Sequence, residues 1–72
     1  MPIRVTDLGG HRWRLVYYTS QPDEYAQFLE WIAQYRDRCG WWDNRGYSGQ
    51  LEYIEVRSRD MPLRTLIALK WS

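Results

Sequence analysis

The feature that most constrains this chain is one strong helical stripe in the middle of the sequence. Between residues 21 and 39, apolar side chains recur every three or four positions, and charged and amide side chains cover the opposite side. Pro22, Asp23 and Glu24 favour the beginning of a helix, and Gly40 favours its end. We therefore expect one amphipathic helix, which must bury its apolar stripe against another layer of structure.

Alternating apolar and polar residues predict strands on both sides of this helix, and a continuously apolar run predicts the last of them. These strands are residues 3–7 and 12–19 before the helix, and residues 51–58 and 63–71 after it. Residues 40–50 contain three glycines and an Asp-Asn pair, so we expect an irregular loop there.

The predicted fold class is therefore α+β, with the order β-β-α-β-β and residues 1–72 in a single compact domain. One helix packs on one face of a four-stranded, mostly antiparallel sheet. A single helix cannot cover four strands, so the far face of the sheet must meet solvent or a partner. Cys39 is the single cysteine, which excludes an internal disulfide and leaves stability to packing.

Composition and charge exclude several classes of protein. A net charge of +1 argues against a strongly basic nucleic-acid binder, and 17% aromatic residues argue against disorder. Pro2, Arg4 and Asp7 interrupt any signal peptide, and we expect a cytoplasmic protein with no membrane segment. Cys39 and His11 are too few ligands for a zinc site, so no metal or cofactor is expected.

No residue pattern predicts catalysis, and we expect a protein that is not an enzyme. The chain has no nucleophile elbow, phosphate-binding glycine loop or metalloprotease helix motif. One enzyme class stays open, a small toxin-like ribonuclease that uses the RNA 2′-hydroxyl as its nucleophile. Its candidate residues are Arg14, Tyr18, Arg57 and His11. The low net charge argues against it, because such enzymes must hold phosphates.

A surplus of tryptophan, tyrosine and arginine predicts a binding surface. The chain has five Trp and six Tyr, and nine of its ten basic residues are Arg. These residue types are enriched at interface hot spots. We expect Trp41 and Trp42 to point apart, so that at most one of them closes the edge of the core. The predicted partner-binding patch is Trp41, Trp42, Arg45 and Tyr47, with support from Trp31, Arg14 and Tyr18.

These observations favour a small non-enzymatic inhibitor or adaptor that binds a host or effector protein and acts by steric blockade. Phages and other mobile elements encode compact proteins of this kind, including anti-CRISPR and other anti-defence proteins. The alternative is a module for single-stranded nucleic acid, because bases stack on aromatic rings and arginine contacts phosphates. A homodimer through the bare sheet face or a strand edge is a further expectation.

Overall fold

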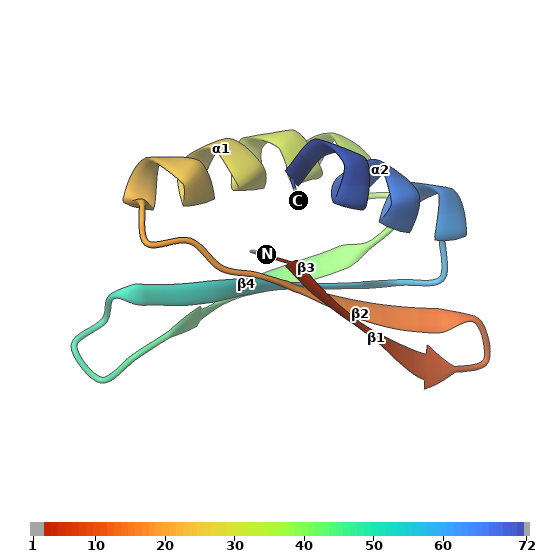
Figure 1. Ribbon diagram of the computed structural model, residues 1–72, viewed down its shortest axis with the longest axis horizontal. Coiled ribbons are helices and arrows are strands. Elements are labelled where there is room, and N and C mark those ends of the chain that lie inside the picture. Colours follow the sequence, from red (N-terminus) through yellow and green to blue (C-terminus); the bar gives the residue numbers. More distant parts are fainter. Residues whose placement is uncertain (1–2, 72) are drawn as a thin grey trace.

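The computed structural model describes residues 3–71, which form two layers, a sheet and a pair of helices (Figure 1). The elements in chain order are β1 (Ile3–Gly9), β2 (Arg12–Tyr17), α1 (Pro22–Ile32), a short 3-10 helix (Ala33–Tyr35), β3 (Gly40–Arg45), β4 (Leu51–Ser58) and α2 (Met61–Trp71). The sheet has the order β1-β2-β4-β3, and every neighbouring pair is antiparallel. Both helices lie on the same face of the sheet (Figure 1). The α+β class and the four-stranded antiparallel sheet are thus confirmed.

Two elements differ in kind from the sequence prediction, and the helix predicted for residues 21–39 is shorter, since α1 ends at Ile32 and the 3-10 helix ends at Tyr35. The segment expected as an irregular loop contains β3, which pairs with β4 and supplies the fourth strand. The pair Trp41 and Trp42 alternates between the two faces of the sheet, and the turn is confined to the residues around Gly49, whose φ is +79°. Bulky aromatic residues at adjacent positions favour extended backbone, and this preference outweighs the flanking glycines.

The second difference is at the C-terminal end, where a strand was predicted and the structure has α2. Leu63 and Ile67 are four positions apart and both are fully buried, which is helical spacing. The Asp60 carboxylate accepts a hydrogen bond of 3.0 Å from the backbone N–H of Leu63, as an N-cap residue does. Pro62 lies in the first turn, where its missing N–H costs nothing. The order β-β-α-β-β with one helix is therefore wrong, because residues 61–71 form a second helix that begins at the Asp60 cap.

The core lies between the inner face of β2 and β4 and the two helices. Tyr17 stacks on Phe28 with ring centroids 4.5 Å apart, which joins β2 to α1. The buried residues of this cluster are Trp13, Leu15, Tyr17, Tyr25, Phe28, Ile32, Ile54, Val56, Leu63 and Ile67. Four more aromatic side chains pack around its edge, namely Trp31, Tyr35, Trp41 and Trp71. Eight of the twelve aromatic residues therefore serve the core or its border.

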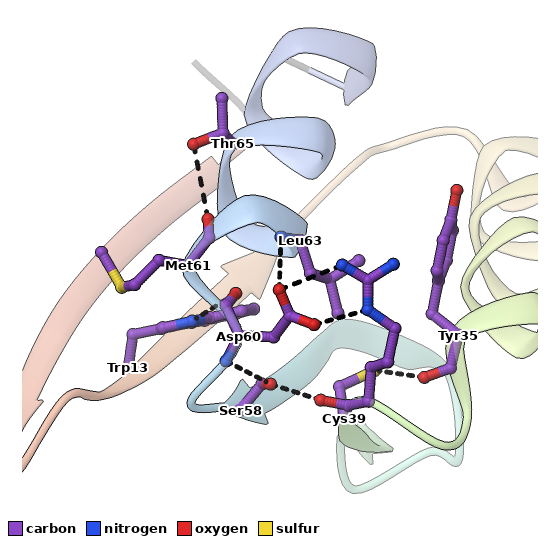
Figure 2. Close-up of polar contacts among 9 residues, drawn as sticks. Trp13, Tyr35, Cys39, Ser58, Asp60, Met61, Leu63 and Thr65 are labelled. Atoms are coloured by element: carbon purple, nitrogen blue, oxygen red, sulfur yellow. Dashed lines mark hydrogen bonds and ion pairs between the residues drawn. The ribbon is translucent and has the colours of Figure 1, made fainter.

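A polar junction fixes the start of α2 against the rest of the fold (Figure 2). The Arg38 guanidinium donates to both carboxylate oxygens of Asp60, at 2.5 and 3.0 Å. The indole N–H of Trp13 donates to the Asp60 carbonyl at 3.1 Å, and the Ser58 hydroxyl donates to the Arg38 carbonyl. This junction links β2, β4 and the segment that precedes β3 to the first turn of α2.

Candidate functional site

The face of the sheet that points away from the helices carries an unusual set of side chains, which we call the open face. Residues paired across antiparallel strands share a face, so the register of the four strands assigns its members, and Tyr18, which follows β2, joins them through its ring contact with Tyr53. They are Arg4, Thr6, Arg12, Arg14, Val16, Tyr18, Trp42, Asn44, Tyr53, Glu55 and Arg57. Neither helix covers these residues (Figure 1).

Glu55 is the centre of the open face. It is 4% exposed, although it lies on the outer side of the sheet, because long side chains close over it. Arg57 donates from Nε to one carboxylate oxygen at 2.9 Å. Arg14 Nε lies 3.0 Å from the other oxygen, but its N–H is not aligned on it, so this contact is an ion pair without a hydrogen bond. A buried carboxylate is tolerated here because both of its oxygens face a positive charge.

The same carboxylate explains why two arginines can stand side by side. Arg14 and Arg57 are directly opposite each other on β2 and β4, where like charges normally destabilise a sheet. Glu55 lies next to both and offsets their repulsion. The side chains of Arg14 and Arg57 remain 37% and 51% exposed, so their guanidinium groups still reach solvent.

Three aromatic rings complete the open face. The guanidinium carbon of Arg57 lies 5.2 Å from the centre of the Trp42 ring, a cation–π contact. Tyr18 and Tyr53 meet edge to face, with ring centroids 6.1 Å apart. Trp42 is 42% exposed and Tyr18 37%, so both rings keep surface for a partner. These three rings and Tyr47 are the aromatic residues outside the core and its border.

Charge is segregated between the two layers of the molecule. The charged residues that the register assigns to the open face are Arg4, Arg12, Arg14, Arg57 and Glu55, which together carry a charge of +3. The whole chain has a net charge of +1, so all remaining residues together carry −2. The low net charge therefore conceals a basic face, and the objection to an anionic partner that composition raised does not apply to this surface.

The predicted patch of Trp41, Trp42, Arg45 and Tyr47 is not one continuous surface. Trp41 points to the helix side and packs against the core, whereas Trp42 points to the open face. The expectation that only one of the two closes the core is confirmed. Arg45 is held within the β3–β4 hairpin by Asp43 at 2.9 Å and by the Gly49 carbonyl at 3.0 Å. Tyr47 is fully exposed in the turn between β3 and β4, beyond the paired residues of the sheet.

The supporting residues divide in the same way. Trp31 belongs to the helix layer, where its ring lies 5.0 Å from Tyr35 and 6.1 Å from Trp71. Arg14 and Tyr18 lie on the open face with Trp42. Sequence reasoning missed Tyr53 and Glu55 as site residues. The alternation of Tyr53, Glu55 and Arg57 along one strand was the signal that could have placed them on one outward face.

The residues considered for nucleophilic or metal chemistry are not assembled into a site. His11 lies in the β1–β2 turn with a φ of +63° and borders a shallow pocket with Asp7, Arg12 and Met61. Cys39 lies near the end of the 3-10 helix, where burial raises the pKa of its thiol. Among residues 3–71 no three His, Cys, Asp or Glu side chains are grouped to hold a metal ion. Within the same residues, no helix is long and apolar enough to cross a membrane.

Comparison with models of known protein families gave no match, and searches of curated proteins and of solved structures gave no significant match either. The functional assignment of this chain therefore rests on the chemistry of the open face.

Proposed function

We propose that this chain is a non-enzymatic binding protein whose interface is the open face, and that it acts by covering the surface of the macromolecule it binds. The observation that carries this proposal is the placement of Trp42, Tyr18 and Tyr53 together with arginines on a sheet face that neither α1 nor α2 covers. Tryptophan, tyrosine and arginine are the residue types that contribute most to binding energy when they lose solvent.

The contacts around Glu55 support binding because they hold the interface in place before a partner arrives. Glu55 fixes two arginines, and Arg57 in turn stacks on Trp42. Ordering a free side chain on binding costs about 0.5–1.5 kcal/mol, and side chains that are already ordered avoid much of this cost. The open face is therefore pre-organised in its centre.

Two features support a role without catalysis. Both oxygens of Glu55 are engaged by arginines, which leaves this carboxylate poorly suited to accept a proton from a substrate. Partial burial raises the pKa of the Cys39 thiol, so little reactive thiolate forms at neutral pH. The ribonuclease alternative would also need His11, which lies in the turn beyond the end of β1.

The test is capture of partners from lysate of the encoding organism on immobilised protein, with and without nuclease treatment. The variant Trp42→Ala/Tyr53→Ala should lose the bound partner, because truncation of a hot spot typically costs about 2 kcal/mol or more. Tyr47→Ala is the matched control, since Tyr47 is exposed outside the open face. Equal capture by both variants, with folding verified by circular dichroism, would refute this interface.

A second candidate function is a protein-binding inhibitor that docks through the helix layer. Met61, Leu66 and Leu69 of α2 are exposed, Leu69 to 79%, and a nucleic-acid ligand does not explain this apolar surface. Steric blockade of a host or effector protein, as in anti-CRISPR and other anti-defence proteins, fits such a surface. Leu66→Lys/Leu69→Lys would abolish nuclease-resistant capture on this account and leave it unchanged if the open face is the interface.

A further inference from the structure

The register of the sheet arranges the open face in rows across β2 and β4. One row holds Arg14 opposite Arg57, and the next holds Glu55. The third brings Tyr18 beside Tyr53, with ring centroids 6.1 Å apart. Successive rows are two residues apart, or about 7 Å along a strand. One end of the open face is therefore cationic and the other is aromatic.

Arg14 and Arg57, at the cationic end, keep N–H donors that are free to bind a ligand. Both contact Glu55 through Nε, and within residues 3–71 no hydrogen bond occupies their terminal η nitrogens. A guanidinium group presents these N–H donors in a planar fork that matches the oxygens of a phosphate. Glu55 thus holds two such forks beside each other, with their free edges toward solvent.

Small residues on both sides keep this pair accessible. Thr6 of β1 lies beside Arg14, and Gly40 of β3 lies beside Arg57. A side-chain carbon built on Gly40 would meet no atom within 4 Å, so the space next to Arg57 is open. An anion therefore meets no side chain at the Gly40 position beside Arg57.

The aromatic rings beside the cationic end favour a nucleic-acid phosphate over a protein carboxylate as the bound anion. A carboxylate of a partner protein would account for the arginines, but it makes no use of flat rings one or two rows away. Trp42 lies in the row of Glu55, and the pair Tyr18–Tyr53 lies in the row beyond it. Stacked bases need such rings, and each base is joined to a phosphate at short range. The charge of +3 on this face also favours a polyanion.

We propose that the open face binds single-stranded nucleic acid, with a backbone phosphate on Arg14 and Arg57 and bases stacked on Trp42, Tyr18 and Tyr53. This inference rests on the proposed binding function of the same face and names its ligand. Glu55 is a positioning residue, which acts through the arginines and does not touch the ligand. The contacts are to phosphate and ring surfaces, so binding tolerates different base sequences.

The probe is a fluorescein-labelled oligothymidylate about twelve nucleotides long, within the usual site sizes of such proteins, titrated with the full chain by fluorescence anisotropy. The logarithm of the affinity should fall linearly with the logarithm of the salt concentration. The slope should be about −2, since the face of charge +3 neutralises about three phosphates and each phosphate of a single strand contributes about −0.7. Arg14→Gln/Arg57→Gln should weaken binding about tenfold at low salt and reduce the slope to about −1.4, because the one phosphate that this pair holds is lost. A duplex of equal length should bind more weakly, because its bases are not free to stack.

The matched control is Arg36→Gln/Lys70→Gln, which removes the same charge from exposed positions on the helix side. Its affinity should stay within about twofold of the wild type, because screening limits the reach of those charges. Arg14→Gln/Glu55→Gln/Arg57→Gln repeats the test without leaving a buried carboxylate unpaired, in case the double variant does not fold.

Three results would overturn the inference: no binding at low salt, equal losses in the test and control variants, or equal affinity for the duplex. If the oligonucleotide does not bind while a nuclease-resistant partner is captured through Trp42 and Tyr53, the ligand is a protein. The proposed function would then stand and this inference would fail. Absence of both kinds of binding would refute the two together.

Discussion

Replacement of Glu55 by glutamine should destabilise the fold, although Glu55 lies on the outer face of the sheet. The side chain is 5% exposed, and it separates two arginines that stand directly opposite each other. Glutamine keeps the size of the side chain and removes its charge. Glu55→Gln therefore weakens both ion pairs and leaves the repulsion between Arg14 and Arg57 without compensation.

The expected loss follows from the two contacts. A hydrogen bond to a charged group contributes about 1.5–3 kcal/mol, and an exposed ion pair about 0.2–1 kcal/mol. The Arg57 contact at 2.9 Å is a true hydrogen bond, but Arg57 is half exposed, so we take about 1 kcal/mol for it. The unaligned Arg14 contact and the released repulsion add about 0.5 kcal/mol or slightly more. The free energy of unfolding should thus fall by about 1–2 kcal/mol.

Urea unfolding followed by tryptophan fluorescence measures the change in the free energy of unfolding. In thermal unfolding, the same change should lower the melting temperature of a domain of this size by about 5–15 °C. The deficit should shrink in about 1 M salt, where screening weakens the repulsion between the arginines. Glu52→Gln is the control, because Glu52 lies on the same strand and is exposed. A Glu55→Gln protein as stable as the Glu52→Gln protein would show that the arginines do not depend on this carboxylate.

Three other predictions follow from the same structure. Arg38 above all, and then a backbone N–H, holds the pKa of Asp60 below its ordinary value, so this contribution to stability is present above about pH 4 and is lost as pH falls further. Asp60→Asn should therefore be less stable than the wild type near neutral pH in urea melts and converge with it in acid; a constant difference across pH would contradict this cause. Trp41→Ala should lower the free energy of unfolding by about 2–4 kcal/mol because Trp41 packs against the core, and Trp42→Ala by less than about 1 kcal/mol because Trp42 is exposed. The reverse order would mean that Trp41 and Trp42 are assigned to the wrong faces of the sheet. Cys39 should react with a thiol reagent far more slowly in the native state than in denaturant at about pH 8, since burial raises the pKa of its thiol; equal rates would refute its burial.

Much of the fold was readable because local patterns and tertiary packing agree. The alternation in residues 12–17 and 51–58 survives in β2 and β4, and the apolar stripe of α1 faces the sheet as predicted. The failures are the two segments where local signals compete. In residues 40–50 three glycines and an Asp-Asn pair suggested a loop, but residues 40–45 pair with β4 as a strand. In residues 61–71 an apolar run suggested a strand, but the Asp60 cap and the spacing of Leu63 and Ile67 made a helix.

The candidate site was only partly predictable for a related reason. The surplus of aromatic residues and arginine was visible in composition, but its location depended on whether residues 40–45 form a strand. Because β3 pairs with β4, Trp42 lies on the open face with Tyr18 and Arg14, whereas Trp41 lies on the opposite face against the core. The central role of Glu55 depends on a cross-strand register that no local pattern encodes.

The most direct test of the open face as the interface is a map of amide and indole NMR shifts on titration with the oligothymidylate probe. We predict that shifts concentrate on β2, β3 and β4 and that, among the five indole N–H signals, Trp42 moves most. The buried indole of Trp13, which donates to the Asp60 carbonyl, should stay in place. Shifts confined to α1 and α2, with the Trp42 signal unchanged at saturation, would contradict the account.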